Sequence, residues 1–406
     1  AANATTPNFA PSGALTLGST LQFPAGGTHP SLTGSPSAVF TNGVAAISGL
    51  RYDEVGIIEI TAAQGGSYLG IGSAETAKIR GSSGFVGRFR PARLALASNV
   101  PLLASACSAG AFSYIGQPVY FGTAPVLSVT AQSALGTTTT NYTQSGFFKL
   151  DTALAGRSYA DGSGAHALGY SAAGGVTLGG STSGSGTATL ALASGDGGDA
   201  INWTRADPEG PFTADVDAVF TAASLTDSDG ACHDPDANGS CDSFTISGIE
   251  GTQLRYGRLA TQNVLGSEMQ ALPVPVTVQY HDGRGFVLND ADSCTQLTAE
   301  TLDFGVGSYA EEPAAGTLSF PIGRGTSTAS MPSTTLSAGR LDLLLSAPGA
   351  GNVGDIDYLI DLAPLGMTWL LYDWDGDRRY IDSPRGRASF GIYSGPSRVV
   401  YRRESW

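Results

Sequence analysis

The chain has 406 residues, a mass of 41.3 kDa and a formal net charge of −14, with 41% hydrophobic and only 14% charged residues. This acidic balance argues against a general nucleic-acid binder, which needs a basic face. No run of 18 apolar residues is present, so the sequence predicts no membrane span, and the apolar fraction is high enough to exclude wholesale disorder.

Short strands separated by turns are predicted along the whole chain. Segments with strand composition lie at Val55–Thr61, Val274–Tyr280, Leu341–Ser346, Ala388–Tyr393 and Arg398–Arg403. Glycine, proline and asparagine punctuate the sequence at short intervals, as expected for tight turns. No segment of eleven or more residues keeps the apolar spacing of an amphipathic helix. The sequence therefore predicts an all-β protein of several consecutive antiparallel β-sandwich (Ig-like) units with little helix.

Shifts in composition divide the chain into four predicted β units. Their expected bounds are residues 1–96, 97–205, 206–305 and 306–406. The second unit contains a stretch rich in Gly, Ser, Ala and Thr, residues 156–198, whose composition is also that of a flexible linker. We expect ordered small-residue strands there, at Val176–Leu178 and Thr187–Ala193.

Four cysteines are present, at positions 107, 232, 241 and 294. Three pairings are possible, and we favour Cys232 with Cys241 and Cys107 with Cys294, because the first two flank one acidic loop. Paired cysteines, few lysines and many Ser and Thr residues are typical of an exported protein. The first residues do not form a signal peptide, so a mature or trimmed product is expected.

The strongest local motif is the acidic segment 227–242. Oxygen side chains fall at positions 1, 3, 5, 7 and 9 of an EF-hand-type loop that starts at Asp234, with Gly239 at position 6. These predicted calcium ligands are Asp234, Asp236, Asn238, Ser240 and Asp242. Position 12 holds Thr245 in place of the usual glutamate, so Asp227, Asp229 or water would have to complete the site. The alternative is a solvated acidic turn held by the disulfide alone.

A second acidic segment, at residues 373–382, is also a candidate calcium loop. Its predicted ligands are Asp373, Asp375, Asp377 and Asp382. Arg378 and Arg379 follow at once and would neutralise the carboxylates in the alternative interpretation, a plain acidic turn. The pairs Asp196/Asp199 and Asp290/Asp292 are predicted to be simple turns.

Three aromatic residues, Tyr372, Trp374 and Tyr380, cluster around the second acidic segment. Exposed rings would stack on a sugar, whereas buried rings would pack in the core. Enzyme motifs are lacking: there is no Gly-x-Ser-x-Gly, His-Glu-x-x-His or phosphate-binding Gly-x-x-x-x-Gly-Lys sequence. The sequence therefore predicts no catalytic residues and no enzyme, although a carboxylate pair for glycoside hydrolysis need not be close in sequence.

Several short blocks along the chain form an ordered signature. They are Tyr52–Ile57, Val86–Pro91, Phe112–Pro118, Leu254–Leu259, Pro273–Val276, Asp290–Thr295, Arg387–Tyr393 and Val399–Glu404. In this order they resemble the C-terminal domain of MshQ-type proteins, which are encoded with the mannose-sensitive haemagglutinin type IV pilus. The resemblance implies a secreted or cell-surface β-protein of a Gram-negative bacterium, without catalytic residues, whose partners are pilus or cell-surface components.

Together these observations predict a non-enzymatic surface or pilus-associated protein with a structural or adhesive role, stabilised by calcium and disulfides. A first alternative is a self-assembling extracellular filament, in which an N-terminal strand within residues 1–23 completes the sheet of another copy. A second alternative is a carbohydrate-binding or glycan-active protein.

Overall fold

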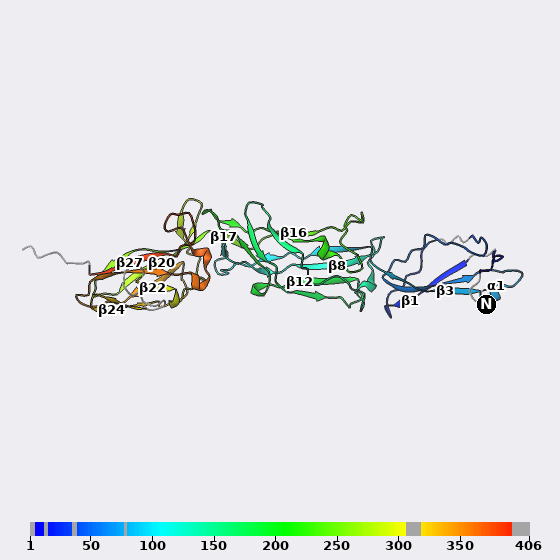
Figure 1. Cartoon of the computed structure of the whole chain (residues 1–406), viewed down its shortest axis with the longest axis horizontal. Coiled ribbons are helices and arrows are strands. Elements are labelled where there is room, and N and C mark those ends of the chain that lie inside the picture. Colours follow the sequence, from blue (N-terminus) through cyan, green and yellow to red (C-terminus); the bar gives the residue numbers. More distant parts are fainter. Residues whose placement is uncertain (1–4, 12–14, 35–38, 77–78, 306–317, 392–406) are drawn as a thin grey trace, which may run out of the picture.

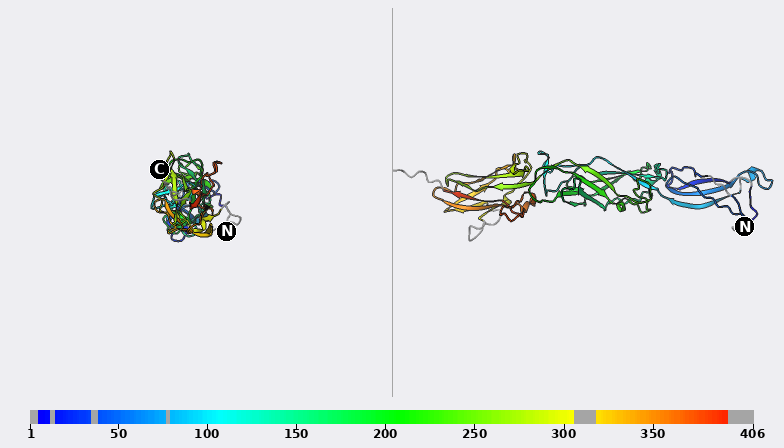
Figure 2. Two further views of the ribbon diagram at one scale, coloured as in Figure 1. Left: turned by 90° about the vertical axis from the view of Figure 1, so that its left-hand side faces the viewer. Right: turned by 90° about the horizontal axis from the view of Figure 1, so that it is seen from above.

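The computed structural model describes residues 5–11, 15–34, 39–76, 79–305 and 318–391. Three β bodies follow one another along a rod, with the N-terminal body at one end and the C-terminal body at the other (Figure 1). Seen along its length, the rod has a small cross-section (Figure 2). The predicted all-β fold is confirmed. Helical structure in the described residues is limited to α1 (Ser73–Thr76) and to short 3₁₀ turns, η1 (Thr140–Thr143), η2 (Gly195–Gly197), η3 (Ala222–Leu225), η4 (Ala299–Thr301), η5 (Ala363–Leu365) and η6 (Thr368–Leu370).

The N-terminal body is an antiparallel sheet of three strands in the order β1-β2-β3. These are β1 (Leu15–Phe23), β2 (Gly56–Gln64) and β3 (Arg80–Phe89). β1 pairs with β2 along its whole length, so this segment is the first strand of its own sheet. Phe23 and Phe85 are exposed large side chains, and most of β3 is exposed on both faces. This body therefore has little core of its own.

The middle body contains the strands from β4 to β17 around one large hydrophobic core. Its elements are β4 (Arg93–Ser98), β5 (Leu102–Leu103), β6 (Phe112–Tyr114), β7 (Phe121–Thr123), β8 (Val126–Gln132), β9 (Arg157–Asp161), β10 (Leu168–Ser171), β11 (Val176–Gly179), β12 (Thr187–Leu192), β13 (Ala200–Trp203), β14 (Phe212–Thr213), β15 (Val216–Phe220), β16 (Phe244–Ile249) and β17 (Gln253–Arg255). A sheet β11-β12-β8-β4 and a sheet β16-β15-β9 supply many of the core residues, and shorter sheets complete the body. Leu127, Leu190 and Phe220 are fully buried in it.

The expected small-residue strands are confirmed, because β11 and β12 lie within the Gly- and Ser-rich stretch and pair with each other. Alternate residues of β12 face the core. The small side chains in this stretch let the neighbouring strands lie close together. The expected boundary between residues 205 and 206 is crossed by strand pairing, since β9 pairs with β15 and β6 pairs with β17. The change in composition there does not end a sheet.

The C-terminal body is a β-sandwich of two sheets. Its strands are β18 (Gly257–Thr261), β19 (Val264–Gly266), β20 (Leu272–His281), β21 (Phe286–Leu288), β22 (Leu302–Phe304), β23 (Ser319–Ile322), β24 (Gly325–Ser330), β25 (Arg340–Leu345), β26 (Gly354–Ile360) and β27 (Arg385–Phe390). One sheet has the order β18-β20-β25-β24-β23, with β21 beside β20, and the other has the order β19-β27-β26-β22. Inward residues of both, such as Val274 and Phe390, share one core.

Two details of this sandwich follow from local sequence. Pro273 and Pro275 lie in the part of β20 that pairs with β25 and extends beyond the end of β18. On the side of β20 where β18 has ended, a proline without an N–H group costs no hydrogen bond between strands. β22 pairs with β26, so strand pairing also crosses the boundary expected between residues 305 and 306. The strand predicted at Arg398–Arg403 lies outside the described residues.

The cysteines pair as favoured from the sequence, Cys107 with Cys294 and Cys232 with Cys241, and no cysteine is free. In the described part of the chain, no helix has the length and apolar character needed to cross a membrane.

Candidate functional site

The first joint connects the N-terminal and middle bodies through one buried carboxylate. The Glu54 side chain, 5% exposed, accepts hydrogen bonds from the backbone N–H groups of Val55, Thr140 and Asn141 at 2.8, 3.0 and 3.2 Å. The Thr140 hydroxyl donates a fourth bond at 3.1 Å. A carboxylate has enough acceptor sites for all four donors, whereas a neutral amide does not.

Asn141 completes this joint from the middle body. Its Oδ1 accepts the N–H of Thr28 at 2.7 Å, and its Nδ2 donates to the carbonyl oxygens of Thr28 and Val55, both at 2.8 Å. The side chain is fully buried, so these bonds replace those that water would otherwise make. Glu54 and Asn141 therefore clamp two separate segments of the N-terminal body onto the turn η1.

Arginines from β3 and its end reinforce the same joint. Arg88 forms an ion pair with Asp229 at 2.8 Å, donates to the carbonyl oxygen of Phe147 at 2.8 Å and lies over the Phe147 ring. Arg90 donates to the carbonyl oxygen of Asp229. These charge-assisted hydrogen bonds join the N-terminal body to the middle body, and their geometry favours one orientation of the two bodies.

Asp229 therefore belongs to the first joint, and Asp227 lies beside it within the middle body. Neither is in the group of carboxylates that the predicted calcium loop brings together. Asp227 is buried and accepts the Tyr142 hydroxyl at 2.9 Å and the N–H of Ala231 at 2.8 Å. Burial and the neighbouring Asp227 carboxylate raise the pKa of Tyr142, which keeps its hydroxyl protonated as a donor. Sequence spacing could not reveal this role, because Tyr142 comes from a distant turn.

The second joint is formed by a segment of the middle body that enters the core of the C-terminal body. Phe112 and Tyr114 of β6 are buried within that core, and the Cys107–Cys294 disulfide closes the contact. The Tyr114 hydroxyl donates to Asp292 at 2.7 Å and accepts from Asn289 at 2.6 Å. Burial, followed by the charge of Asp292, raises the pKa of Tyr114. The predicted turn is present, because the N–H of Asp292 donates to the carbonyl oxygen of Asn289 at 3.0 Å. Asp292 is in addition a buried anchor of the second joint, a role that the sequence did not indicate.

Arg205 adds a buried cation to the second joint. Its guanidinium donates to the carbonyl oxygens of Gly257 at 3.2 Å, Leu371 at 2.9 Å and Trp369, and it lies 4.3 Å from the centroid of the Tyr256 ring. Burial lowers the pKa of Arg205. Carbonyl oxygens and an aromatic face compensate the charge without an anion. Both joints are therefore built from buried, hydrogen-bonded groups.

The first acidic loop brings together three of its predicted ligands, the carboxylates of Asp234, Asp236 and Asp242, within 4.8 Å of one another. Asp234 accepts the N–H groups of Asn238 at 3.1 Å and Gly239 at 3.0 Å. Burial opposes ionisation of Asp234, but these hydrogen bonds outweigh it, so its pKa lies below the ordinary value. The amide oxygen of Asn238 accepts the N–H of Ser240 at 2.7 Å. Side chains of the loop therefore accept hydrogen bonds from the loop's own backbone.

The second acidic loop brings together Asp373, Asp375 and Asp377, also within 4.8 Å. Oδ1 of Asp373 is buried and accepts no hydrogen bond from any described residue, while Oδ2 accepts the N–H of Arg378 at 3.1 Å. Asp382 is not part of this group, and its Oδ2 accepts the backbone N–H of Trp374 at 3.0 Å. Arg379 approaches Asp377 at 3.7 Å in an exposed ion pair, so the expected neutralisation by arginine is slight.

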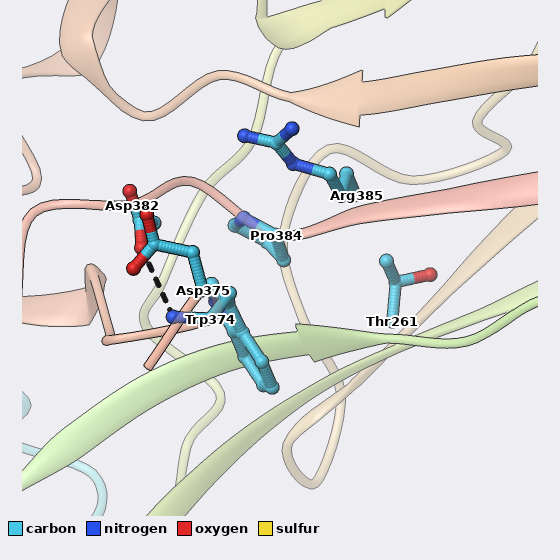
Figure 3. A pocket seen from close by; sticks show the side chains of 6 residues that line it. All are labelled: Thr261, Trp374, Asp375, Asp382, Pro384 and Arg385. Atoms are coloured by element: carbon cyan, nitrogen blue, oxygen red, sulfur yellow. Dashed lines mark hydrogen bonds between the residues drawn. The ribbon is translucent and has the colours of Figure 1, made fainter. Parts of the chain in front are cut away.

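The three aromatic residues near this loop have different environments. Tyr372 and Tyr380 pack against the core of the middle body. Burial and the nearby Asp207 raise the pKa of Tyr380 to about 12. Trp374 lines a hollow (Figure 3). The other residues that line it are Thr261, Asp375, Asp382, Pro384 and Arg385. All three rings are partly buried, and Trp374 is the one of the three that lines this hollow.

A chain of antiparallel β bodies joined end to end by buried contacts is the class of protein that this fold defines. Two family models match the sequence: DUF6701, third domain, over residues 54–248, and DUF6701, fourth domain, over residues 255–405. The chain belongs to the DUF6701 family. The first match begins at Glu54 of the first joint, and the gap between the matches lies beside the second joint. No curated protein matches the chain.

Proposed function

We propose that this protein is an extracellular structural rod, a non-enzymatic component of a bacterial surface or pilus. The observation that carries the proposal is the pair of buried joints, which fix three β bodies in line (Figure 1). Bodies linked by exposed, flexible segments would move independently, whereas buried and bonded contacts favour one relative arrangement. Two disulfides support an oxidising location outside the cytosol.

The association with a pilus or cell surface of a Gram-negative bacterium rests on the resemblance to MshQ-type proteins. Pilus or cell-surface components are the partners that the proposal implies, and a structural or adhesive role suits a long, narrow molecule. A self-assembling filament is the second candidate. It is favoured by one observation: β1 and β3 are edge strands of a sheet with exposed Phe23 and Phe85, and an edge strand can pair with another chain.

Glu54→Gln is the variant that tests the rod. Glutamine supplies one acceptor oxygen, so its NH2 group faces either the two donors of Thr140 or the N–H groups of Val55 and Asn141. The variant should lose about 2 kcal/mol of contact energy at the first joint, the penalty for an unsatisfied buried polar group. In small-angle X-ray scattering we expect one extended shape for the natural sequence and a mixture of bent shapes for the variant.

Glu59→Gln on the same sheet is the matched control, because Glu59 is partly exposed and makes only a long contact to Gln22 at 3.4 Å. It should scatter like the natural sequence. If the natural protein is already compact or bent in solution, the proposal of a structural rod is wrong. Light scattering in the same samples separates the second candidate, since a filament gives polymers that survive dilution.

Calcium is proposed as a stabiliser of the rod. The second acidic loop fits a hard cation, because its clustered carboxylates include a buried oxygen, Oδ1 of Asp373, that no described donor satisfies. The first loop supplies three carboxylates in one turn under a disulfide. When bound, calcium would neutralise these carboxylates and tie each loop together.

The chelated protein should gain stability when calcium is added, by about 2.7 kcal/mol at 100 times the dissociation constant. Asp375→Asn and Asp236→Asn should each reduce this gain, because each removes one charged ligand from a separate cluster. Asp151→Asn, which changes a carboxylate bonded to the N–H of Ala153 in an unrelated turn, should leave it unchanged. Thermal unfolding with calcium and with chelator measures the effect. Equal thermal unfolding midpoints with calcium and with chelator would contradict calcium binding at both loops.

A further inference from the structure

A hollow beside the second acidic loop is used by neither joint. It has a volume of 280 Å³ and opens to solvent between the loop, the end of β18 and the start of β27 (Figure 3). This volume lies just below the range of about 300–1,000 Å³ typical of ligand pockets, which suits a single small ring. One aromatic ring and several polar groups converge on it.

The aromatic wall of the hollow is held in a fixed orientation. The Trp374 indole lies 4.9 Å from the Arg258 guanidinium and 5.2 Å from the Tyr372 ring, both of which belong to a packed aromatic cluster. In Figure 3 the indole stands as one side of the hollow, with Thr261 beside it and Pro384 and Arg385 above. A rigid aromatic face of this kind offers contact area at little entropic cost.

The polar wall offers both a donor and acceptors. Arg385 is exposed, and its side chain makes no ion pair or hydrogen bond within the part of the chain that the structure describes. Asp382 uses Oδ2 for the Trp374 N–H, and Asp375 uses Oδ1 for the N–H of Asp377. Each carboxylate therefore keeps a second oxygen that can accept from a ligand. An aromatic face with a free guanidinium and free carboxylate oxygens matches a ring that carries several hydroxyl groups.

We propose that this hollow binds one neutral hexose ring of a saccharide. The C–H face of the sugar packs on Trp374, its hydroxyls donate to Asp382, and Arg385 donates to a hydroxyl or ring oxygen. A neutral sugar is favoured over an acidic one because the protein has a net charge of −14. This site adds a ligand to the structural rod and does not depend on it.

An oligosaccharide array tests the proposal with the whole chain as probe. The array carries mannose-, glucose- and galactose-based oligosaccharides, with uronic-acid oligosaccharides alongside. We expect binding to at least one neutral series, and at least tenfold weaker binding for Arg385→Ala and for Trp374→Ala. Arg385→Ala changes an exposed, unpartnered side chain, so its thermal unfolding midpoint should match that of the natural sequence. This separates lost binding from lost folding.

Arg379→Ala is the matched control, because Arg379 lies on the same loop outside the hollow and its side chain makes one exposed ion pair, with Asp377. It should bind within twofold of the natural sequence. Three results would each overturn the proposal: no binding to neutral saccharides at millimolar concentration, binding that Arg385→Ala and Trp374→Ala leave intact, or binding confined to uronic acids. Small-angle X-ray scattering tests the rod independently of the array, so a failure of the sugar-binding proposal does not imply a failure of the rod proposal.

Discussion

Replacing Cys107 and Cys294 together by alanine is expected to lower the free energy of unfolding by about 5 kcal/mol, from the chain entropy that a long disulfide loop removes from the unfolded state. The two cysteines are 187 residues apart, so the bridge restricts a large part of the chain. The effect should be strong at the second joint, since the bridge fixes the segment that carries Phe112 and Tyr114 into the C-terminal core. Denaturant titration of the variant and the natural protein measures the loss.

The other disulfide supplies an internal comparison. Cys232 and Cys241 are 9 residues apart, so the same reasoning gives about 3 kcal/mol when both become alanine. The order of the two losses is the test, because both variants remove the same atoms. A smaller loss for the long loop than for the short one would contradict the expectation that Cys107–Cys294 locks two bodies.

Asp199→Asn is expected to destabilise the middle body by about 3–5 kcal/mol at neutral pH, the range for a buried ion pair that loses one partner. Asp199 is 1% exposed and forms an ion pair with buried Arg157 at 2.6 Å. It also accepts the Tyr159 hydroxyl and the N–H of Gly174 at 2.8 Å. Asparagine would leave the Arg157 charge buried without an anion. Denaturant unfolding at pH 7 gives the loss directly.

The pH dependence of this variant provides a second readout. Burial tends to raise the pKa of Asp199, but Arg157, Tyr159 and Gly174 outweigh it, so the pKa lies below its ordinary value of 3.8. A lowered carboxyl pKa stabilises the folded state above the unfolded pKa, and this stabilisation is lost as the pH falls below 3.8 toward the folded pKa. The difference between natural protein and variant should therefore shrink in acid.

A surface ion pair is the control for this prediction. Asp53 pairs with Arg51 at 2.9 Å, but the arginine side chain is 48% exposed. Asp53→Asn should therefore change stability by less than about 1 kcal/mol. Equal losses for Asp53→Asn and Asp199→Asn would show that burial does not set the cost.

Local sequence was a good guide where the signal is local. Strand composition located β20 and β25, and the small-residue strands β11 and β12 were found within a stretch that composition alone could call a linker. Each acidic loop gathers three carboxylates, because alternating oxygen side chains and glycine shape a turn within a few residues. The disulfide pairing agreed with the spacing of the cysteines.

Non-local roles were assigned incorrectly or missed. Asp199 was expected in a simple turn, yet it is the buried partner of Arg157, 42 residues away. No local pattern indicates the roles of Glu54 and Arg205, although each is central to a joint. Asp227 and Asp229 have the spacing of metal ligands, but Tyr142 and Arg88 bind them from other parts of the chain.

The sequence by itself determined the all-β class, the ordered glycine-rich strands, the pairing of the cysteines and the two acidic turns. These depend on side-chain alternation and turn chemistry within a few residues of the chain. Only the tertiary structure decided the strand pairing across the expected boundaries, the two joints and the hollow at Trp374. The physical reason is that burial and compensation of a charge depend on groups brought together from distant segments, which no single stretch of sequence contains.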